Sequence, residues 1–314
     1  MIYDLRHRTT YSYKASVTFA RCVLRLTPQT SACQTVLENL VTVVPAPAHS
    51  LQRTGPFGEQ TLTVVVDEPH RELIIEASSR VDVHPPPPRP LADSPSWETV
   101  RARSFDAAGL EPNDPASFLY PTRRTPLAPM ITDYARTSFT VGRPIAEAAA
   151  DLMTRMYADF TYDSEATTVS TPTLEAFEAR RGVCQDFAHV MISGLRGLGL
   201  PAAYVSGYLR TRPPPGKPRL AGADATHAWV SVWCGQETGW IGFDPTNAVI
   251  VRDQHIVLAV GRDYSDVAPI DGIILAPGEQ TLKVEVDVVP EDEPGALMPS
   301  VAARPPAGVG YVRP

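Results

Sequence analysis

Three side chains in the second half of the chain, Cys184, His227 and Asp244, have types that could together transfer an acyl group. Cys184 directly precedes a run with helical periodicity, and a helix N-terminus stabilises a thiolate through its unpaired N–H groups and its dipole. Gly182, two residues earlier, would let the backbone turn tightly there. From position alone, Cys184 could equally be a small buried apolar residue, the commonest role of a free cysteine.

The surroundings of His227 and Asp244 predict a β-hairpin, with strands near 228–233 and 240–243 and a turn in 235–239. If His227 lies directly opposite Asp244, one face of the hairpin is wholly apolar. A slip of one residue would reverse every side chain, so the pattern favours this pairing. Asp244 would then fix the imidazole tautomer and leave the other ring nitrogen for a thiol. A cross-strand polar pair without chemistry remains the alternative.

Three sequence blocks resemble the transglutaminase-like superfamily, in the same order along the chain. They are Gly-Val-Cys-Gln-Asp-Phe-Ala at 182–188, His-Ala-Trp-Val at 227–230 and Phe-Asp-Pro-Thr at 243–246. Residues 160–162, residues 261–267 and the Tyr-Ser-Tyr of the N-terminal region resemble the bacterial branch, so the resemblance covers about residues 1–290. It implies a papain-like core in which Cys184 is the nucleophile, His227 the general base and acid, and Asp244 the orienting carboxylate.

These residues predict acyl transfer through a thioester. Cys184 would attack an amide or ester carbonyl, and His227 would protonate the leaving amine. The Cys184 backbone N–H and the Tyr162 hydroxyl are candidate oxyanion donors. The candidate walls of a substrate cleft are Tyr208, Trp229 and Tyr264. No cofactor or metal is expected, because the sequence has neither a calcium-binding loop nor the ligand spacing of a metal site.

The expected substrate is a peptide or protein, and the favoured activity is that of a thiol peptidase or amidase. The alternatives are an amine-accepting protein-glutamine transglutaminase and a catalytically inactive binding scaffold. The loop 210–221, with Pro213-Pro214-Pro215-Gly216, could roof the cleft and forms no evident acidic pocket for a lysine ammonium, which favours water as the acceptor. Among the other histidines, His189 is predicted to pack inside the fold. Surface positions are predicted for His7, His49, His70, His84 and His255.

The fold that must position these residues is predicted to be α+β, with an N-terminal antiparallel β-sandwich domain followed by the papain-like or transglutaminase-like core. Residues 1–88 hold short segments rich in Val, Ile, Thr and Tyr between Pro, Gly or polar clusters. The predicted strands there are 5–13, 20–26, 35–44, 60–66 and 72–83. Residues 89–129 are predicted to be a Pro-rich linker and bridging region, because proline cannot join a sheet ladder.

The catalytic core is placed at residues 130–289 and a disordered Pro-rich tail at 290–314. Apolar residues recur with helical spacing in two segments, 145–156 and 184–198. Gly199 and Pro201 end the second of these helices. Strands are predicted at 204–209, 228–233, 240–243 and 281–289.

Composition limits the partners and the location. The 314 residues carry a formal net charge of −7, which disfavours nucleic acid as a partner. No apolar run is long enough to cross a bilayer, and the N-terminus lacks the basic start and apolar block of a signal peptide. The four cysteines have no metal-binding or disulfide pattern, which favours reduced thiols and a cytoplasmic protein. The sequence leaves the oligomeric state open.

Overall fold

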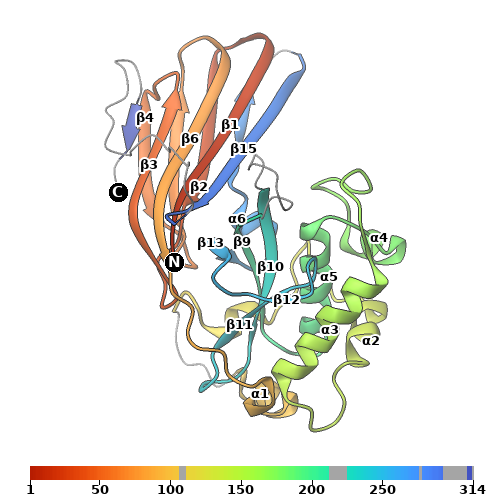
Figure 1. Cartoon of the computed structure of the whole chain (residues 1–314). Helices are drawn as coiled ribbons and strands as arrows, with labels where there is room; N and C mark the ends of the chain where they lie inside the picture. The colour runs from red at the N-terminus through yellow and green to blue at the C-terminus, as the bar shows by residue number, and fades with distance from the viewer. Residues whose placement is uncertain (106–110, 212–224, 276–277, 293–309, 313–314) are drawn as a thin grey trace, which may run out of the picture.

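The computed structural model describes residues 1–105, 111–211, 225–275, 278–292 and 310–312. A long β-sandwich lies against an α+β core in which helices cover one face of a second sheet (Figure 1). The predicted fold class is therefore confirmed. Within the described residues, no helix is both long enough and apolar enough to cross a membrane.

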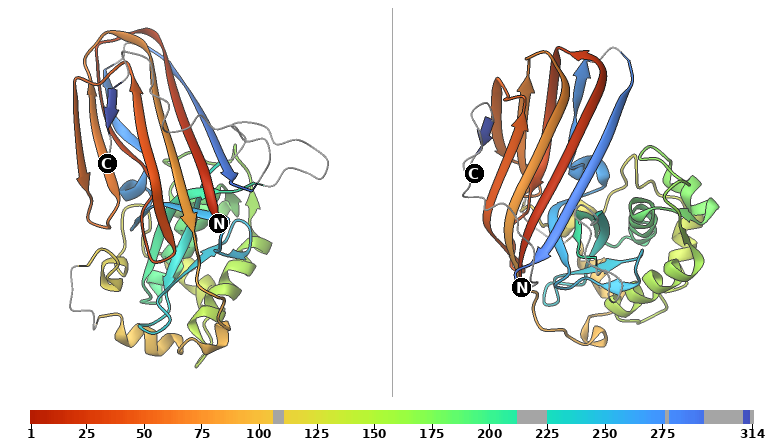
Figure 2. Two further views of the ribbon diagram at one scale, coloured as in Figure 1. Left: turned by 60° about the vertical axis from the view of Figure 1, so that its left-hand side comes forward. Right: turned by 45° about the horizontal axis from the view of Figure 1, so that its top comes forward.

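The sandwich is built from two antiparallel sheets, shown from two further sides in Figure 2. One sheet has the strand order β15-β1-β6-β3-β16 and the other the order β14-β2-β5-β4. Side chains on β1 alternate between the buried interior and the surface, as in a strand with one face in a core. The strands are β1 (Ile2–Val17), β2 (Phe19–Thr27), β3 (Gln34–Val44), β4 (His49–Thr54), β5 (Gln60–Val66), β6 (His70–Val83), β14 (Ile270–Leu275), β15 (Gln280–Pro290) and β16 (Gly310–Val312). All five strands predicted in residues 1–88 are present, whereas β4 was missed because its residues are all exposed.

The sandwich also includes strands from the end of the chain, so the predicted boundary of the core at residue 289 is wrong. The chain returns after the core, and β15 pairs with β1 from Tyr3↔Pro290 to Tyr13↔Gln280. β14 extends the other sheet beside β2. The alternating pattern at 281–289 correctly indicated a strand, but it did not say which sheet that strand joins. The sandwich is thus assembled from both ends of the sequence.

Part of the predicted tail is also structured. Gly310–Val312 forms β16, which pairs antiparallel with residues 41–43 of β3. For these three residues the prediction of disorder is wrong, because their backbone pairs with the edge of β3. Residues 293–309 and 313–314, which belong to the same prediction, lie outside the described residues.

The core sheet has the order β12-β11-β10-β9-β13. Helix α5 packs against β9 and β10 and is surrounded on its other sides by α2, α3 and α4 (Figure 1). The elements of the core are η1 (Leu91–Asp93), α1 (Trp97–Arg103), η2 (Pro115–Phe118), α2 (Pro129–Arg136), α3 (Ile145–Asp159), β7 (Thr161–Tyr162), α4 (Thr173–Ala179), β8 (Arg181–Gly182), α5 (Cys184–Gly197), β9 (Ala202–Leu209), β10 (Ala225–Trp233), β11 (Trp240–Asp244), β12 (Val249–Ile250), β13 (His255–Gly261) and α6 (Tyr264–Val267). Both helices predicted from periodicity, 145–156 and 184–198, correspond to α3 and α5.

The region between the sandwich and α2 is part of the core and not a free spacer. Trp97 and Val100 of α1 are buried in the same apolar cluster as α3 and α5. The indole N–H of Trp97 also donates to the carbonyl of Thr140 at 2.9 Å. The prediction of a linker over 89–129 is therefore corrected: its prolines shape loops, but aromatic and aliphatic side chains between them anchor the segment.

The sandwich and the core sheet share an apolar interior. Tyr208 of β9 and Ile256 and Leu258 of β13 lie in the buried cluster of the sandwich. At the same junction, the Gln34 side chain donates to the carbonyl of Val257 and accepts from its N–H, both at 2.8 Å. Because the amide satisfies both polar groups of one residue, it fixes the position of β13 relative to the sandwich.

Candidate active site

Cys184 is the first residue of α5, as predicted, and its thiol is partly exposed. The turn before it is tight. The backbone N–H of Val183 donates to the Asp186 carboxylate at 2.9 Å, which satisfies one of the free N–H groups near the helix start. A Cβ at Gly182 would lie 2.5 Å from that carboxylate, so only glycine fits there. The sequence thus places a partly exposed thiol at the N-terminus of a helix, where the helix dipole favours a thiolate.

The segment that leads into Cys184 is held by an arginine among aromatic rings. Arg180 ends α4 in the left-handed conformation, with φ 52°. Its guanidinium carbon lies 4.1 Å from the ring centroid of Phe177, 4.6 Å from that of Tyr134 and 4.7 Å from that of Phe160. Such cation–π contacts are attractive, and they offset the unfavourable backbone conformation. β8 then pairs with β7, which brings Tyr162 beside Gly182.

Two side chains of α5 hold the loop between β7 and α4 beside the thiol. Asp186 accepts a hydrogen bond from the Thr167 hydroxyl at 2.6 Å. Gln185 donates to the carbonyl of Val169 at 3.2 Å. Burial raises the pKa of Asp186, although its bonds to Thr167 and Val183 oppose this effect. The first turn of α5 therefore positions both the nucleophile and one side of its surroundings.

His227 and Asp244 lie on adjacent strands and form a direct hydrogen bond, with 2.8 Å between Nε2 and Oδ2. The predicted faces of the hairpin are correct, but the predicted register is wrong by two residues. Val230 lies opposite Phe243, so Asp244 is a diagonal neighbour of His227 and not its direct partner. The turn causes this difference: residues 234–239 form a six-residue loop closed by a bond from Cys234 N–H to the carbonyl of Gly239. A slip of two residues preserves both faces.

Asp244 is completely buried, and every polar atom of its carboxylate is hydrogen-bonded. Oδ1 accepts from the backbone N–H groups of Thr246 and Asn247, at 3.0 and 3.3 Å. Oδ2 accepts from His227, from the Asn247 side-chain amide at 2.7 Å and from His255 Nε2 at 3.2 Å. Burial opposes the charge, but the bonds from the two histidines and Asn247 hold the pKa of Asp244 well below its usual range. Asp244 is thus an anion at neutral pH.

His227 is nine-tenths buried between this carboxylate and Cys184. Burial disfavours the imidazolium, but hydrogen bonding to Asp244 and Cys184 outweighs it and raises the pKa of His227 to about 10. Since Nε2 is bonded to Asp244, Nδ1 is the nitrogen left for the thiol. The three predicted residues are therefore brought together, and the arrangement can withdraw a proton from a thiol and return it to a leaving group.

His255 and Asn247 are members of this cluster that the sequence did not indicate. His255 was predicted to lie on the surface, but it is 5% exposed and its ring packs edge-on against Trp229. His7 and His70 are also buried, contrary to prediction, because both lie in the sandwich interior. His49 and His84 are exposed, as predicted. One signal was available for His255: it begins an apolar segment, His-Ile-Val-Leu-Ala-Val-Gly, that has the composition of a buried strand.

Three of the four aromatic residues predicted at the site lie near the triad. Tyr162 is 56% exposed, and Tyr264 of α6 is half-buried; both are close enough to Cys184 for its charge to raise the pKa of their phenols, after the larger effect of burial. Trp229 stacks on His227 but is 1% exposed, so it supports the imidazole from inside the fold. The prediction that Trp229 forms a wall of the cleft is therefore wrong.

Tyr208 does not line the site. Its ring lies in the interior of the sandwich, and its hydroxyl is 3.0 Å from Nδ1 of His7. The prediction that it forms a cleft wall is wrong, because this end of β9 packs against the sandwich. The Pro213–Gly216 loop that was predicted to roof the cleft lies outside the described residues. His189 is buried, as predicted, and its Nε2 accepts from the backbone N–H of Tyr264 at 3.2 Å.

Within the part of the chain that the structure describes, His227, Asp244 and His255 form the group of possible metal ligands whose donor atoms lie within 4.8 Å of one another. These atoms are already bonded to one another, at 2.8 and 3.2 Å, through protons that a metal would have to displace. The cluster therefore fits a hydrogen-bonded relay better than a cation site.

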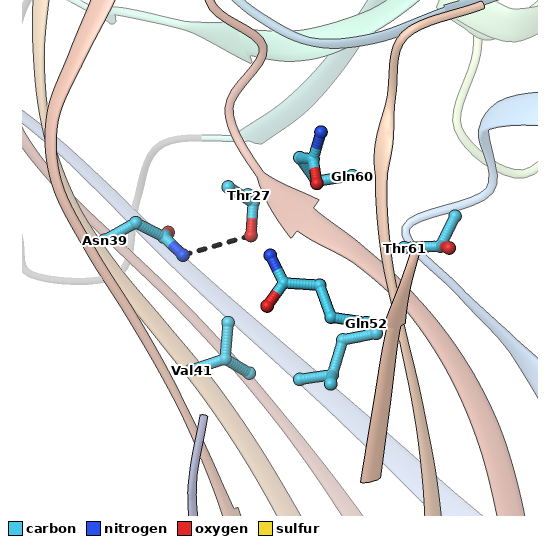
Figure 3. Close-up of a pocket in the computed structure, with 7 residues that line it drawn as sticks. Thr27, Asn39, Val41, Gln52, Gln60 and Thr61 are labelled. Carbon is cyan, nitrogen blue, oxygen red and sulfur yellow. Dashed lines mark hydrogen bonds between the residues drawn. The ribbon is translucent and has the colours of Figure 1, made fainter. Parts of the chain in front are cut away.

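A hollow in the sandwich lies apart from these residues. It is lined by Thr27, Asn39, Val41, Gln52, Gln60, Thr61 and Leu62, and Figure 3 shows Asn39 donating to the Thr27 hydroxyl. Its lining has amides and hydroxyls but no nucleophile or titratable group. This hollow therefore offers no alternative to Cys184, His227 and Asp244 as a candidate catalytic site.

Two known protein families match parts of this chain. Residues 3–82 match the bacterial transglutaminase-like N-terminal region, and residues 133–245 match the transglutaminase-like superfamily. An uncharacterized protein of Mycobacterium tuberculosis is 44% identical over 295 residues, which cover 92% of this chain and 92% of that protein. The chain belongs to the transglutaminase-like superfamily. A Mycobacterium leprae relative is 33% identical over 297 residues and covers 90% of this transglutaminase-like chain and 96% of its own.

Two further proteins are similar to this transglutaminase-like chain. A solved structure titled "Putative Cysteine Protease", from Cytophaga hutchinsonii, has a TM-score of 0.72 and covers 93% of this chain and 92% of its own, at 20% identity. That likeness shows a shared fold over most of this chain. The protein-glutamine gamma-glutamyltransferase of Pseudomonas aeruginosa is 32% identical over 152 residues, which are 41% of this chain and 23% of that protein.

Proposed function

We propose that this protein is a thiol peptidase or amidase, which hydrolyses an amide bond of a peptide or protein through a thioester. The observation that supports the proposal best is the hydrogen-bonded series from Asp244 to His227 to Cys184 at the start of α5. In it, a partly exposed thiol meets an imidazole that a buried carboxylate holds in one tautomer.

In the proposed reaction His227 Nδ1 already holds the thiol proton, in line with its raised pKa, and the Cys184 thiolate attacks the carbonyl carbon. The developing oxyanion is stabilised by the Cys184 backbone N–H, and the exposed Tyr162 hydroxyl is the proposed second donor. The C–N bond then breaks, and His227 returns its proton to the leaving amine. Water, deprotonated by His227, attacks the thioester and releases the acid and the free thiol. Tyr264 is the proposed substrate contact on the α6 side.

Water is proposed as the acceptor, rather than a lysine amine, because of the charge beside Tyr264. The guanidinium carbon of Arg124 lies 5.5 Å from the ring centroid of Tyr264. Burial raises the pKa of the Tyr264 phenol, and the charge of Arg124 lowers that pKa more than the charge of Asp271 raises it. A cation at this position repels a lysine ammonium. The similarity to the Pseudomonas aeruginosa transferase favours the competing activity, an amine-accepting transglutaminase. A cytoplasmic location is also part of the proposal and is supported by four free cysteines.

The deciding experiment supplies an acyl-donor peptide amide together with a primary amine at millimolar concentration and follows the products by mass spectrometry. Free acid should predominate, and the Cys184→Ala variant should give neither product. A predominance of amide conjugates would replace the hydrolase with a transglutaminase. If no peptide from a diverse library is turned over while Cys184 remains intact, the protein is a binding scaffold.

A further inference from the structure

His255 contacts the carboxylate of Asp244 but takes part in none of the proposed reaction steps. It begins β13, and its Nε2 lies 3.2 Å from the same Asp244 oxygen that binds His227. The ring is nearly perpendicular to Trp229, with 5.1 Å between centroids, and lies 6.2 Å from the ring of His227. Two imidazoles from different strands therefore converge on one buried carboxylate oxygen.

The carboxylate determines which nitrogen of His255 holds the proton. An ionised carboxylate can only accept, so Nε2 must be the donor. The other nitrogen, Nδ1, is buried and has no hydrogen-bond partner among the described residues. A buried Nδ1 without a hydrogen-bond partner lowers the stability of the fold, so an apolar side chain would fill this position with less loss of stability. The presence of His255 suggests that the bond to Asp244 is what the position requires.

We propose that His255 is a positioning residue for the triad: its Nε2–H fixes Oδ2 of Asp244, and through that oxygen it fixes the ring of His227. This inference rests on the proposed function. Backbone N–H groups of the turn after β11 hold Oδ1, whereas among the described residues Oδ2 is held by the side chains of His227, Asn247 and His255. His227 must change its protonation during each turnover, so the other two donors keep Oδ2 in place while it does so.

The sandwich in turn fixes His255. The next residue, Ile256, points into the sandwich interior, and the Gln34 amide holds both backbone polar groups of Val257. Tyr208, which pairs with Ile256 across the sheet, lies in the same interior. The strand that presents His255 is therefore clamped from the side opposite the triad. This gives the N-terminal region a role in catalysis although it contributes no reacting group.

The test compares His255→Gln with His255→Leu in the full-length protein. Glutamine can still donate an N–H toward Asp244, whereas leucine has a similar size and no donor. His70→Leu, a buried histidine of the sandwich, is the matched control for loss of a buried imidazole. The measurements are kcat and KM on a peptide amide, the rate at which iodoacetamide alkylates Cys184 without substrate, and the thermal midpoint.

His255→Leu should lower kcat and slow Cys184 alkylation by about tenfold, with KM changed less than about twofold. His255→Gln should recover most of both rates, and His70→Leu should keep both. The proposal is overturned if His255→Leu retains wild-type rates, or if glutamine and leucine variants of equal thermal midpoint lose the same activity. Alkylation needs no substrate, so it tests His255 even if the protein proves not to hydrolyse amides.

A measurement on the wild type avoids any folding defect of the variants. In ¹⁵N-labelled protein, histidine NMR should identify His255 as the tautomer protonated on Nε2, with a strongly hydrogen-bonded proton that is lost in Asp244→Asn. Protonation of His255 on Nδ1 alone would contradict the proposed donor.

Discussion

Two buried charges in the core, Asp244 and Arg196, have opposite kinds of surroundings. Arg196 of α5 is 3% exposed, and its guanidinium donates to the carbonyls of Phe118, Ala202 and Arg262 and to the Thr125 hydroxyl, at 2.7–2.9 Å. None of these partners exchanges a proton near neutral pH. Asp244 is equally well satisfied, but two of its partners are imidazoles. A buried charge held by inert groups joins parts of a fold, whereas one held by titratable groups can take part in chemistry.

The pKa shifts at Arg196 and around Asp244 differ in the same way. Burial lowers the pKa of Arg196 to about 10, so it remains charged, with its attached loops fixed, over the whole physiological range. In contrast, hydrogen bonding holds the pKa of Asp244 low and raises that of His227. Changes around Asp244 should therefore alter rate more than stability, and changes at Arg196 the reverse.

The largest effect on rate is expected from Cys184→Ala, which removes the proposed nucleophile. Turnover should fall by about 10⁵-fold, while the thermal midpoint stays within about two degrees, because the side chain is small and partly exposed. In the wild type, iodoacetamide should label Cys184 before Cys22 or Cys234, since both are buried and burial raises the pKa of their thiols. Faster labelling of Cys22, Cys33 or Cys234, followed by peptide mapping, would contradict the assigned nucleophile.

Asp244→Asn should lower kcat by about 10³-fold, less than loss of the nucleophile. An asparagine amide would donate to His227 Nε2 and so place the ring proton on Nδ1, where it faces the thiol and cannot accept its proton. Asn247→Ala provides a comparison, because it removes one donor to Oδ2 but leaves the carboxylate in place. Equal rates for Asp244→Asn and the wild type would mean that another group orients His227.

Arg196→Met should have the largest effect on stability. Three carbonyls and a hydroxyl would lose their donor inside the fold, which should lower the free energy of unfolding by at least about 3 kcal/mol. The kcat per folded molecule, measured below the unfolding transition by active-site titration of Cys184, should stay within about threefold of the wild type. A large loss of kcat in a folded Arg196→Met protein would contradict the claim that Arg196 serves stability and Asp244 serves the reaction.

The pH dependence of stability should separate the same two sites. The lowered pKa of Asp244 contributes stability above its ordinary value of 3.8, and this contribution is lost as the pH falls through the native value. The raised pKa of His227 contributes stability below its ordinary value of 6.5, and this is lost as the pH rises toward about 10. The destabilisation caused by His227→Gln should therefore be largest near pH 5–6 and decline toward pH 9. That caused by Arg196→Met should stay constant over this interval.

The sequence was sufficient to predict three residues that the fold brings together, because Cys184, His227 and Asp244 each lie in a distinctive local block. The hairpin faces could also be predicted, since apolar and polar residues alternate on each strand. The register could not, because it depends on how the backbone closes the loop 234–239. His255 was missed for a related reason: its contact with Asp244 arises only when β13 pairs with β9, and nothing local specifies that pairing.

The same limit explains the errors in domain boundaries. Alternation at 281–289 identified a strand, but pairing with β1 joins residues that are about as far apart in the chain as possible. The aromatic residues of 89–129 were overlooked because prolines dominate its composition. Local patterns thus predicted most of the elements and the residues of the candidate site, whereas the partners of each strand depended on contacts that no short segment contains.

The smallest effect is expected at the end of the chain. A protein ending at Asp292 would retain all of β15, including the bond from the Glu291 N–H to the carbonyl of Ile2, and would lose β16. Three residues paired with the edge of β3 add little to a sandwich whose interior is built by the other strands. The thermal midpoint and the kcat on a small amide should therefore match the full-length protein within about two degrees and twofold. A protein ending at Val284 is the informative contrast, because it removes Val286 and Val288 from the interior and should unfold. If the protein ending at Asp292 instead loses several degrees, residues beyond 292 stabilise the sandwich that positions His255, and its kcat should fall with its stability.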